Sequence, residues 1–144
     1  MDLQDSGISL SIRRVHYVHT MLEDRPGEAY RLLSELLGRR VNLLAFSAVP
    51  IGPGHTQLVL YPEDVDQLTE AIDGLGLTIT SSAQAILIQG DDHLGALADI
   101  HAQLYDVGIN VYSSNGVTDG RGGYGYVLHV RQQDFERAAQ ALGA

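Results

Sequence analysis

The sequence contains no cysteine, no tryptophan and only nine basic residues among 144. Without cysteine the chain can form neither a disulfide framework nor a thiolate-bound metal site. Eighteen acidic residues give a formal charge of -9, which is the wrong sign for a surface that neutralises phosphates, so we expect no nucleic-acid partner. No apolar run approaches the roughly 18 residues of a membrane span, so we expect no membrane partner.

Hydrophobic residues nevertheless make up 44% of the chain, which is enough for a packed core and argues against disorder. The first seven residues, MDLQDSG, are acidic and lack the apolar run of a secretory signal. We therefore expect a cytoplasmic protein.

The sequence matches itself without a gap at an offset of 68 residues, from Asp24 to Ala71. The identical pairs are turn residues and apolar residues: Asp24/Asp92, Gly27/Gly95, Leu36/Leu104, Asn42/Asn110, Gly52/Gly120, Gly54/Gly122, Val59/Val127, Leu60/Leu128, Asp66/Asp134 and Ala71/Ala139. A constant period indicates a duplicated unit, and this period is too long for a solenoid repeat. Each copy is therefore expected to form a small module.

Both copies predict the same order of elements. Short segments rich in β-branched and apolar residues predict strands at 15–22, 41–49, 55–61 and 77–80, and again at 85–89, 109–117 and 124–130. Helical periodicity predicts helices at 28–39, from 62 onwards, at 96–105 and at 133–142. The residues expected on the buried helix faces are Ala29, Leu32, Leu33, Leu36, Leu37, Val65, Leu68, Ile72, Leu75, Leu97, Ile100 and Leu104.

The second copy ends at Ala144, where its fourth strand would begin. Residues 8–13, in which Ile8, Leu10 and Ile12 alternate with other residues, form a spare strand at the same offset from 76–81. No turn residue separates Ile12 from residue 15, which disfavours a hairpin back onto 15–22. We therefore expect the N-terminal strand to complete the second module.

The predicted fold class is α+β, with two ferredoxin-like βαββαβ modules and helices on one face of antiparallel sheets. The expected divisions are residues 1–14 for the N-terminal strand that pairs with the second module, 15–81 for the first module and 82–144 for the second. Modules interlocked in this way would form one cooperative unit.

Two segments of each copy resemble the ACT-domain family of small-molecule sensors. In the first copy they are Glu23-Asp24-Arg25-Pro26-Gly27 and Val41-Asn42-Leu43-Leu44-Ala45; in the second they are Asp92-His93-Leu94-Gly95 and Gly108-Ile109-Asn110-Val111. The family pattern is an acidic residue or Asn, x-Pro-Gly, a helix, and then Ile/Val-Asn-Ile. The second copy departs from it with Leu94 at the proline position. The resemblance spans residues 15–142 and implies two ACT-like modules in tandem.

The resemblance implies an amino-acid ligand, held where the loop before the first helix and the second strand meet a neighbouring module. This is similar to the regulatory parts of serine-inhibited phosphoglycerate dehydrogenase and of aspartokinases. Since ACT modules usually associate side by side, the resemblance also implies a homodimer. Carried over by position, the ligand-binding residues are Asp24, Arg25, Gly27 and Asn42 in the first module and Asp92, Gly95 and Asn110 in the second.

The chemistry of these residues suits a zwitterion. The turn at Gly27 leads into a helix N-terminus, whose unpaired N–H groups suit a carboxylate. Asp24 could accept a hydrogen bond from an ammonium group, and Asn42 offers both a donor and an acceptor. A structural alternative stays open: Asp24 caps the helix, the glycines only form the turn, and Asn42 and Asn110 only secure the starts of strands.

Other kinds of site find little support. His16 and His19 would point to opposite faces of a strand, and His93 beside Asp91 and Asp92 lies in a loop, where three adjacent residues rarely chelate one ion. We therefore expect no metal. The glycine-rich run 119–126 lacks the Gly-Lys-Ser/Thr ending of a phosphate loop and precedes a strand, which favours a hairpin turn.

No Ser-His-acid constellation or cysteine nucleophile occurs, so we expect no catalytic residue, no cofactor and no enzymatic activity. The sequence thus predicts a regulatory protein that binds an amino acid or a similar small ligand at a module or subunit interface and acts on a separate effector protein. The alternative is an ACT-like module that has lost its ligand and acts only by binding proteins through its sheet edges or helices.

Overall fold

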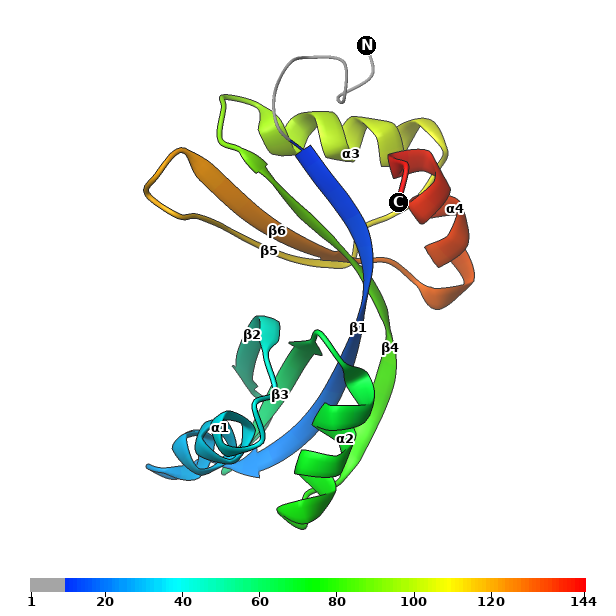
Figure 1. The fold of residues 1–144 in the computed structure, drawn as a ribbon. Helices are drawn as coiled ribbons and strands as arrows, with labels where there is room; N and C mark the ends of the chain where they lie inside the picture. The colour runs from blue at the N-terminus through cyan, green and yellow to red at the C-terminus, as the bar shows by residue number, and fades with distance from the viewer. Residues whose placement is uncertain (1–9) are drawn as a thin grey trace. The chain divides into compact units, whose positions relative to one another are not determined.

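The computed structural model describes residues 10–144. Its elements, shown in Figure 1, are β1 (Leu10–Glu23), α1 (Glu28–Gly38), β2 (Leu43–Pro50), β3 (His55–Pro62), α2 (Val65–Gly74), β4 (Ile79–Asp91), α3 (Ala96–Asp106), β5 (Ser113–Thr118), β6 (Gly123–His129) and α4 (Phe135–Leu142). A short 3₁₀ turn, Gln132–Asp134, precedes α4. Within this part of the chain, no helix combines the length and apolar character that a membrane crossing requires.

The strands form one six-stranded antiparallel sheet in the order β2-β3-β1-β4-β6-β5. Strand β3 pairs with β1 and β2, and β6 pairs with β4 and β5. Strands β1 and β4 occupy the middle of this order. The strands on either side of the middle follow the order found in one ferredoxin-like module. The α+β fold class with two ACT-like modules, predicted from the sequence, is confirmed.

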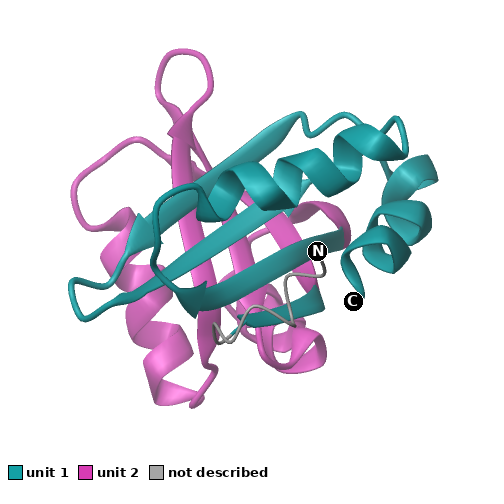
Figure 2. Ribbon diagram, turned by 90° about the horizontal axis from the view of Figure 1, so that it is seen from above, with its two compact units in different colours: residues 1–14, 84–144 teal, residues 15–83 magenta. Residues whose placement is uncertain are grey.

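Two compact units divide the described residues (Figure 2). Unit 2 is Val15–Ala83 and contains the first copy of the repeat; unit 1 is Gln84–Ala144 together with residues 10–14, and contains the second copy. Strands β1 and β4 each contribute one part to either unit.

Each unit has its own core between its two helices and one face of its strands. The core of unit 2 includes Val18, Leu22, Leu32, Leu36, Leu58, Leu60, Leu68, Ala71 and Ile72. The core of unit 1 includes Ile86, Ile88, Ile100, Leu104, Ile109, Tyr126, Leu128, Val130, Phe135, Ala138, Ala139 and Leu142. Leu10 and Ile12 of β1 pack against this second core, and residues 10–14 belong to the same unit. Ile8, the first residue predicted for that strand, lies outside the described residues.

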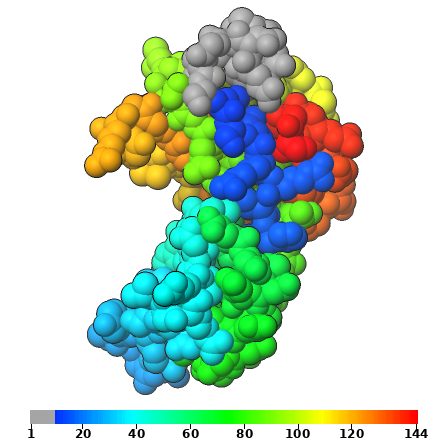
Figure 3. All heavy atoms as spheres, viewed as in Figure 1, coloured from blue at the N-terminus to red at the C-terminus, as the bar shows by residue number. Residues whose placement is uncertain are grey.

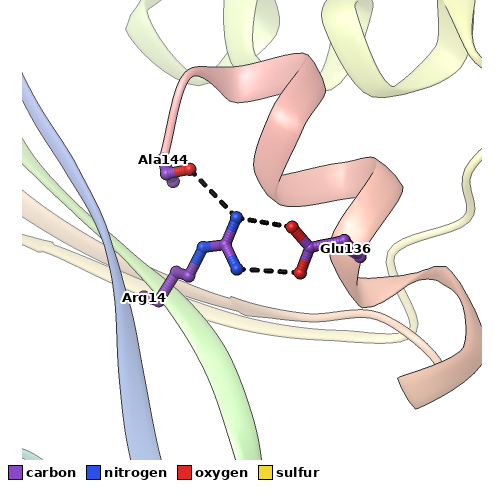
Figure 4. A network of polar contacts seen from close by, with 3 residues as sticks. All are labelled: Arg14, Glu136 and Ala144. Atoms are coloured by element: carbon purple, nitrogen blue, oxygen red, sulfur yellow. Dashed lines mark hydrogen bonds and ion pairs between the residues drawn. The ribbon is translucent and has the colours of Figure 1, made fainter.

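Polar contacts also join the N-terminal strand to α4 within unit 1 (Figure 4). The Arg14 guanidinium donates two hydrogen bonds of 2.8 Å to the Glu136 carboxylate and a third of 3.3 Å to the carbonyl oxygen of Ala144. It also lies 5.9 Å from the centre of the Phe135 ring, within the range of a cation–π contact. The hydrogen bonds raise the pKa of Arg14 and lower the pKa of Glu136.

The two central strands are longer than predicted. Residues 8–13 and 15–22 were expected to form two strands, but β1 is a single strand of 14 residues, Leu10–Glu23. Likewise residues 79–80 of the strand predicted at 77–80 join 85–89 in β4, Ile79–Asp91, a strand of 13 residues. The polar residues around Arg13 and Ser82 interrupt the apolar pattern without turning the backbone, and a continuous strand keeps its backbone groups paired.

Strands β2 and β5 begin later than predicted. Residues 41–42 and 109–112 were expected to be extended, but the amide of Val41 donates to the Leu36 carbonyl at 2.9 Å and that of Ile109 to the Leu104 carbonyl at 3.0 Å. These two amides are thus hydrogen-bonded to the end of the preceding helix. The strands begin only at Leu43 in the first copy and at Ser113 in the second.

Four residues predicted to lie on buried helix faces are exposed, so the prediction is wrong for Ala29, Leu33, Leu37 and Leu97. Leu33 and Leu37 of α1 are 41% and 79% exposed, and Leu97 of α3 is 37% exposed. The buried side of each helix is narrower than the apolar stripe in its sequence, because the helix covers its sheet only on one side.

Candidate functional site

The loops before α1 and α3 have the same backbone geometry. Gly27 and Gly95 precede the helices with φ angles of 90° and 82°, a region that side chains with a Cβ rarely adopt. The amide of Asp24 donates to the Gly54 carbonyl at 2.9 Å, and that of Asp92 to the Gly122 carbonyl at 2.7 Å. Each loop is therefore tied through its backbone to the neighbouring β-hairpin.

Neither α1 nor α3 receives a capping hydrogen bond from a side chain among the described residues. The alternative in which Asp24 caps α1 is therefore wrong. By contrast, the Asp64 carboxylate caps α2, accepting hydrogen bonds from the amides of Asp66 at 3.0 Å and Gln67 at 3.2 Å. The amides of Glu28 and Ala96, the first residues of α1 and α3, donate to the backbone carbonyls of Arg25 at 3.3 Å and of His93 at 3.1 Å. The amides that follow them in the first turn have no side-chain cap.

An open cleft of about 680 Å³ lies beside the start of α3 in unit 1. We call it the α3 cleft; its lining residues are Asp92, His93, Leu94, Gly95, Ala96, Leu97, Ala98, Gly116, Val117, Thr118, Tyr124 and Gly125. They come from the loop before α3, the first turn of α3, the end of β5 and the start of β6. In Figure 3 the tip of the β5–β6 hairpin (orange) and the loop before α3 (green) are separate projections.

Small residues keep the floor of the α3 cleft low. A Cβ added to Gly116 would come within 2.8 Å of Cδ1 of Tyr126, so glycine allows the Tyr126 ring to lie against β5. The hydroxyl oxygen of Tyr126 is 2.7 Å from Nε2 of His101 on α3. This contact joins α3 to β6.

The charges around the α3 cleft are negative. Burial raises the pKa of Tyr124, and the carboxylates of Asp92 and Asp99 raise it further. The hairpin tip is held separately, since the Asp119 carboxylate accepts hydrogen bonds from the amides of Arg121 at 2.6 Å and Gly123 at 3.1 Å, which lower the pKa of Asp119. Asp92 is therefore the residue of the cleft lining whose carboxylate a ligand would contact.

The α3 cleft contains two of the predicted binding residues of the second copy. Asp92 and Gly95 line it, whereas Asn110 is exposed and precedes the start of β5, the end of that strand away from the cleft. The strand register shows this separation, because Ser113, near Asn110, is opposite His129, while Thr118, in the cleft, is opposite Tyr124. Within unit 1 of a single polypeptide, Asn110 therefore does not reach the α3 cleft.

The first copy has a different arrangement. Arg25 makes ion pairs with Glu23 at 2.8 Å and Glu28 at 2.9 Å. These three residues help to line a hollow of about 470 Å³ in unit 2, whose other lining residues are Met21, Leu22, Arg31 and Leu77. Arg25 is the predicted binding residue in that lining. Asp24, Gly27 and Asn42 lie outside it, and Asn42 is at the opposite end of β2 from the Asp24 loop, because Leu43 is opposite Pro62 and Pro50 opposite Thr56.

Sequence reasoning missed the walls of the α3 cleft. Leu94, Leu97, Val117 and Tyr124 line it, but the segments that contain them read only as loop, helix and strand. The small size of Ala98 and Gly116, whose counterparts at the 68-residue offset are Tyr30 and Ala48, could have indicated the cleft.

Residues 10–144 contain no group of three or more His, Asp or Glu side chains placed to hold a metal ion.

Comparison with known proteins establishes the fold. No family profile and no curated protein matches the sequence. Among solved structures, protein BT0572 from Bacteroides thetaiotaomicron is similar, with a TM-score of 0.78 and 16% identity over 92% of this chain and 88% of that one. The ligand-free regulatory subunit of aspartate kinase from Thermus thermophilus has a TM-score of 0.65 and 13% identity over 94% of this chain and 95% of that one.

The aspartate kinase of Clostridium acetobutylicum, described as an allosteric enzyme, gives a TM-score of 0.56 and 16% identity over 95% of this chain and 34% of that one. At such identities the likeness concerns the fold, which is the ACT-like fold of regulatory subunits. This fold thus occurs both as a separate subunit and within a longer kinase chain.

Proposed function

We propose that this protein is a regulatory protein that binds an amino acid and has no catalytic activity of its own. The observation that carries the proposal is the α3 cleft, in which uncapped helix amides and the Asp92 carboxylate lie in one open site. The ACT-like fold shared with regulatory subunits of aspartate kinase supports the same conclusion. We further propose that the protein is cytoplasmic and acts on a separate effector protein.

The cleft offers one partner for each charged group of an amino acid. The amides of Leu97 and Ala98 in the first turn of α3 suit the carboxylate, since they lie at the positive end of the helix dipole. Asp92 suits the ammonium group, and such a charge-assisted hydrogen bond contributes about 1.5–3 kcal/mol. Gly95 lets the backbone turn without a side chain in the way. By the repeat, Asp24, Arg25 and Gly27 are the corresponding candidates in the first copy.

Asn110 and Asn42 would enter such a site from a second subunit. Strand β5 is an edge strand and its residues are exposed. If two copies paired these edges antiparallel about a two-fold axis, the start of one β5 would lie beside the end of the other. Asn110 of one subunit would then approach the α3 cleft of its partner. We therefore propose a homodimer with the ligand at the subunit interface.

Isothermal titration with each of the twenty amino acids, followed by thermal shift, tests the proposal. We expect heat and a raised melting temperature from at least one of them. The double variant Asp92→Asn/Asn110→Ala should lose the response to the amino acid. In size-exclusion chromatography it should elute as a dimer or as a monomer, and not as an aggregate. No heat and no thermal shift from any amino acid would refute the amino-acid ligand.

A second candidate function is a ligand-free protein-interaction module. Exposed apolar side chains favour it, notably Tyr30 and Leu37 of α1, which are 76% and 79% exposed, and Val117 of β5, which is 74% exposed. A chain of this kind would show no amino-acid response, and exchange of Tyr30 and Leu37 to polar residues would abolish binding to its partner protein.

A further inference from the structure

We infer that the amino-acid site lies in unit 1 alone and takes an amino acid whose side chain is uncharged and apolar. This inference rests on the proposed function and narrows it, since the proposal leaves open which copy binds and which amino acid. The two copies of the repeat allow a position-by-position comparison within one chain.

Four residues that line the α3 cleft differ in size or charge from those at the same positions of the first copy, while Leu94, Leu97 and Tyr124 give it larger side walls than Pro26, Ala29 and Thr56 would. At the 68-residue offset, Ala96 stands for Glu28, Ala98 for Tyr30, Gly116 for Ala48 and Thr118 for Pro50. The exchanges at Ala96, Ala98 and Gly116 remove bulk or charge, and the first two lie in the first turn of α3. The residues that line the α3 cleft are therefore not repeated in the first copy.

In unit 2 the helix start already carries a carboxylate. Glu28 is the first residue of α1, and its carboxylate lies 2.9 Å from the Arg25 guanidinium and 3.6 Å from that of Arg31. A negative side chain in the first turn complements the helix dipole, so Glu28 already takes the role at the start of α1 that a ligand carboxylate would have. The corresponding residue of α3 is Ala96, which leaves that position to a ligand.

The charges in the α3 cleft oppose an acidic side chain. Asp92 lines the cleft, and Asp99 is close enough to act on Tyr124 beside it. Among the described lining residues, His93 is the one that can carry a positive charge, and its Nδ1 lies 3.2 Å from the Leu94 carbonyl oxygen. Aspartate or glutamate would therefore place a second carboxylate among carboxylates without a matching cation.

The walls of the cleft favour an apolar side chain over any charged one. Leu94, Leu97 and Val117 line it and are 104%, 37% and 74% exposed. Covering these side chains with an apolar group removes hydrocarbon surface from water on both partners, whereas a charged group would lose hydration against them. The volume of about 680 Å³ is also ample for leucine or phenylalanine.

Calorimetry on the full chain tests the inference with leucine, isoleucine, valine and phenylalanine against aspartate, glutamate and lysine. We expect one site per chain and an affinity for the best apolar amino acid at least about tenfold higher than for any charged one, a difference of about 1.4 kcal/mol. Ala98→Tyr, which installs the residue of the first copy, should abolish binding. Because Tyr30 is 76% exposed in the same position of α1, the fold accepts tyrosine there.

Two matched variants serve as controls. Tyr30→Ala makes the opposite exchange in the first copy, and Asp106→Asn removes an exposed charge from the far end of α3; both should bind like the unmodified chain. Circular dichroism and melting temperature establish that each variant is folded.

Several results would overturn the inference. They are two sites per chain, a preference for a charged amino acid, undiminished binding by folded Ala98→Tyr, and loss of binding only when Asp24 and Asn42 are exchanged. These results would leave the proposed function standing. A chain that binds none of the twenty amino acids would refute both.

Discussion

Arg14 in β1 and Glu136 in α4 are joined by two parallel hydrogen bonds of 2.8 Å each, across 122 positions of the chain. The contact lies on the part of β1 that belongs to unit 1, and a bidentate pair of this kind has more geometric specificity than a single ion pair. Both side chains are partly exposed, at 36% and 61%, so we treat the pair as a link that orients β1 and α4 and not as a large source of stability.

The Arg14–Glu136 pair should make stability depend on pH in the acid range. The folded-state pKa of Glu136 is lowered by the hydrogen bonds from Arg14, so its stabilising effect is present above the unfolded-state pKa and is lost as the pH falls through the folded-state pKa. Glu136→Gln should therefore be less stable than the unmodified chain at neutral pH, and the difference should shrink in acid. Urea unfolding at several pH values measures it.

Glu70→Gln is the matched control for Glu136, since Glu70 is an exposed glutamate of α2. A difference between Glu136→Gln and the unmodified chain that stays constant with pH would contradict the assigned role of the pair.

The interlocked strand makes a second prediction. A fragment of residues 84–144 lacks β1, whose Leu10 and Ile12 pack against the core of unit 1. We expect this fragment to be unfolded or aggregated, because it exposes one side of β4 and part of its core. A matched fragment in which residues 1–14 follow Ala144 through a short linker should regain cooperative unfolding. Circular dichroism and proton NMR distinguish the two, and a well-folded 84–144 fragment would contradict the arrangement.

The left-handed turn before α1 leads to a third prediction. Gly27 has a φ of 90°, with no atom within 4 Å of an added Cβ, so Gly27→Ala should destabilise through backbone strain alone, by about 1–2 kcal/mol. Gly38→Ala at the end of α1 is the control. It has similar space but no positive φ, and it should leave stability unchanged or raise it by up to about 1 kcal/mol. Equal losses of stability in the two variants would contradict the claim that the left-handed turn at Gly27 requires glycine.

The cap of α2 makes a fourth prediction. Asp64 accepts hydrogen bonds from two first-turn amides, so Asp64→Ala should cost about 1 kcal/mol of unfolding free energy. Asp73→Ala removes an exposed carboxylate near the other end of α2, where negative charge is unfavourable, and should be neutral or slightly stabilising. Denaturant midpoints compare them, and equal effects would show that the cap carries no special weight.

Much of the fold could be predicted because the repeat transfers information between the copies. The glycine turns, the backbone tie from Asp24 to Gly54 and the matching tie from Asp92 to Gly122 follow a pattern visible at one offset. The continuous strands β1 and β4 were missed, since side-chain pattern alone does not tell a polar stretch of strand from a break. Exposure of Leu37 was missed because it depends on how far the sheet extends beneath α1.

The candidate site was less predictable. Asp92 and Gly95 line the α3 cleft and Asn110 does not, because residues that flank the same strand lie at its opposite ends. The cleft itself depends on Ala98 and Gly116, small residues that carry no functional group and become informative only beside Tyr30 and Ala48 of the first copy.

An NMR titration of the ¹⁵N-labelled chain with leucine, isoleucine, valine and phenylalanine tests the binding site most directly. If an apolar amino acid binds beside α3, the amide signals of Leu97, Ala98 and Gly116 will shift in a saturable way, while those of Ala29, Tyr30 and Ala48 in the first copy keep their positions. Saturable shifts at the first-copy amides, or no saturable shift in either copy, would contradict the assignment of ligand binding to the α3 cleft.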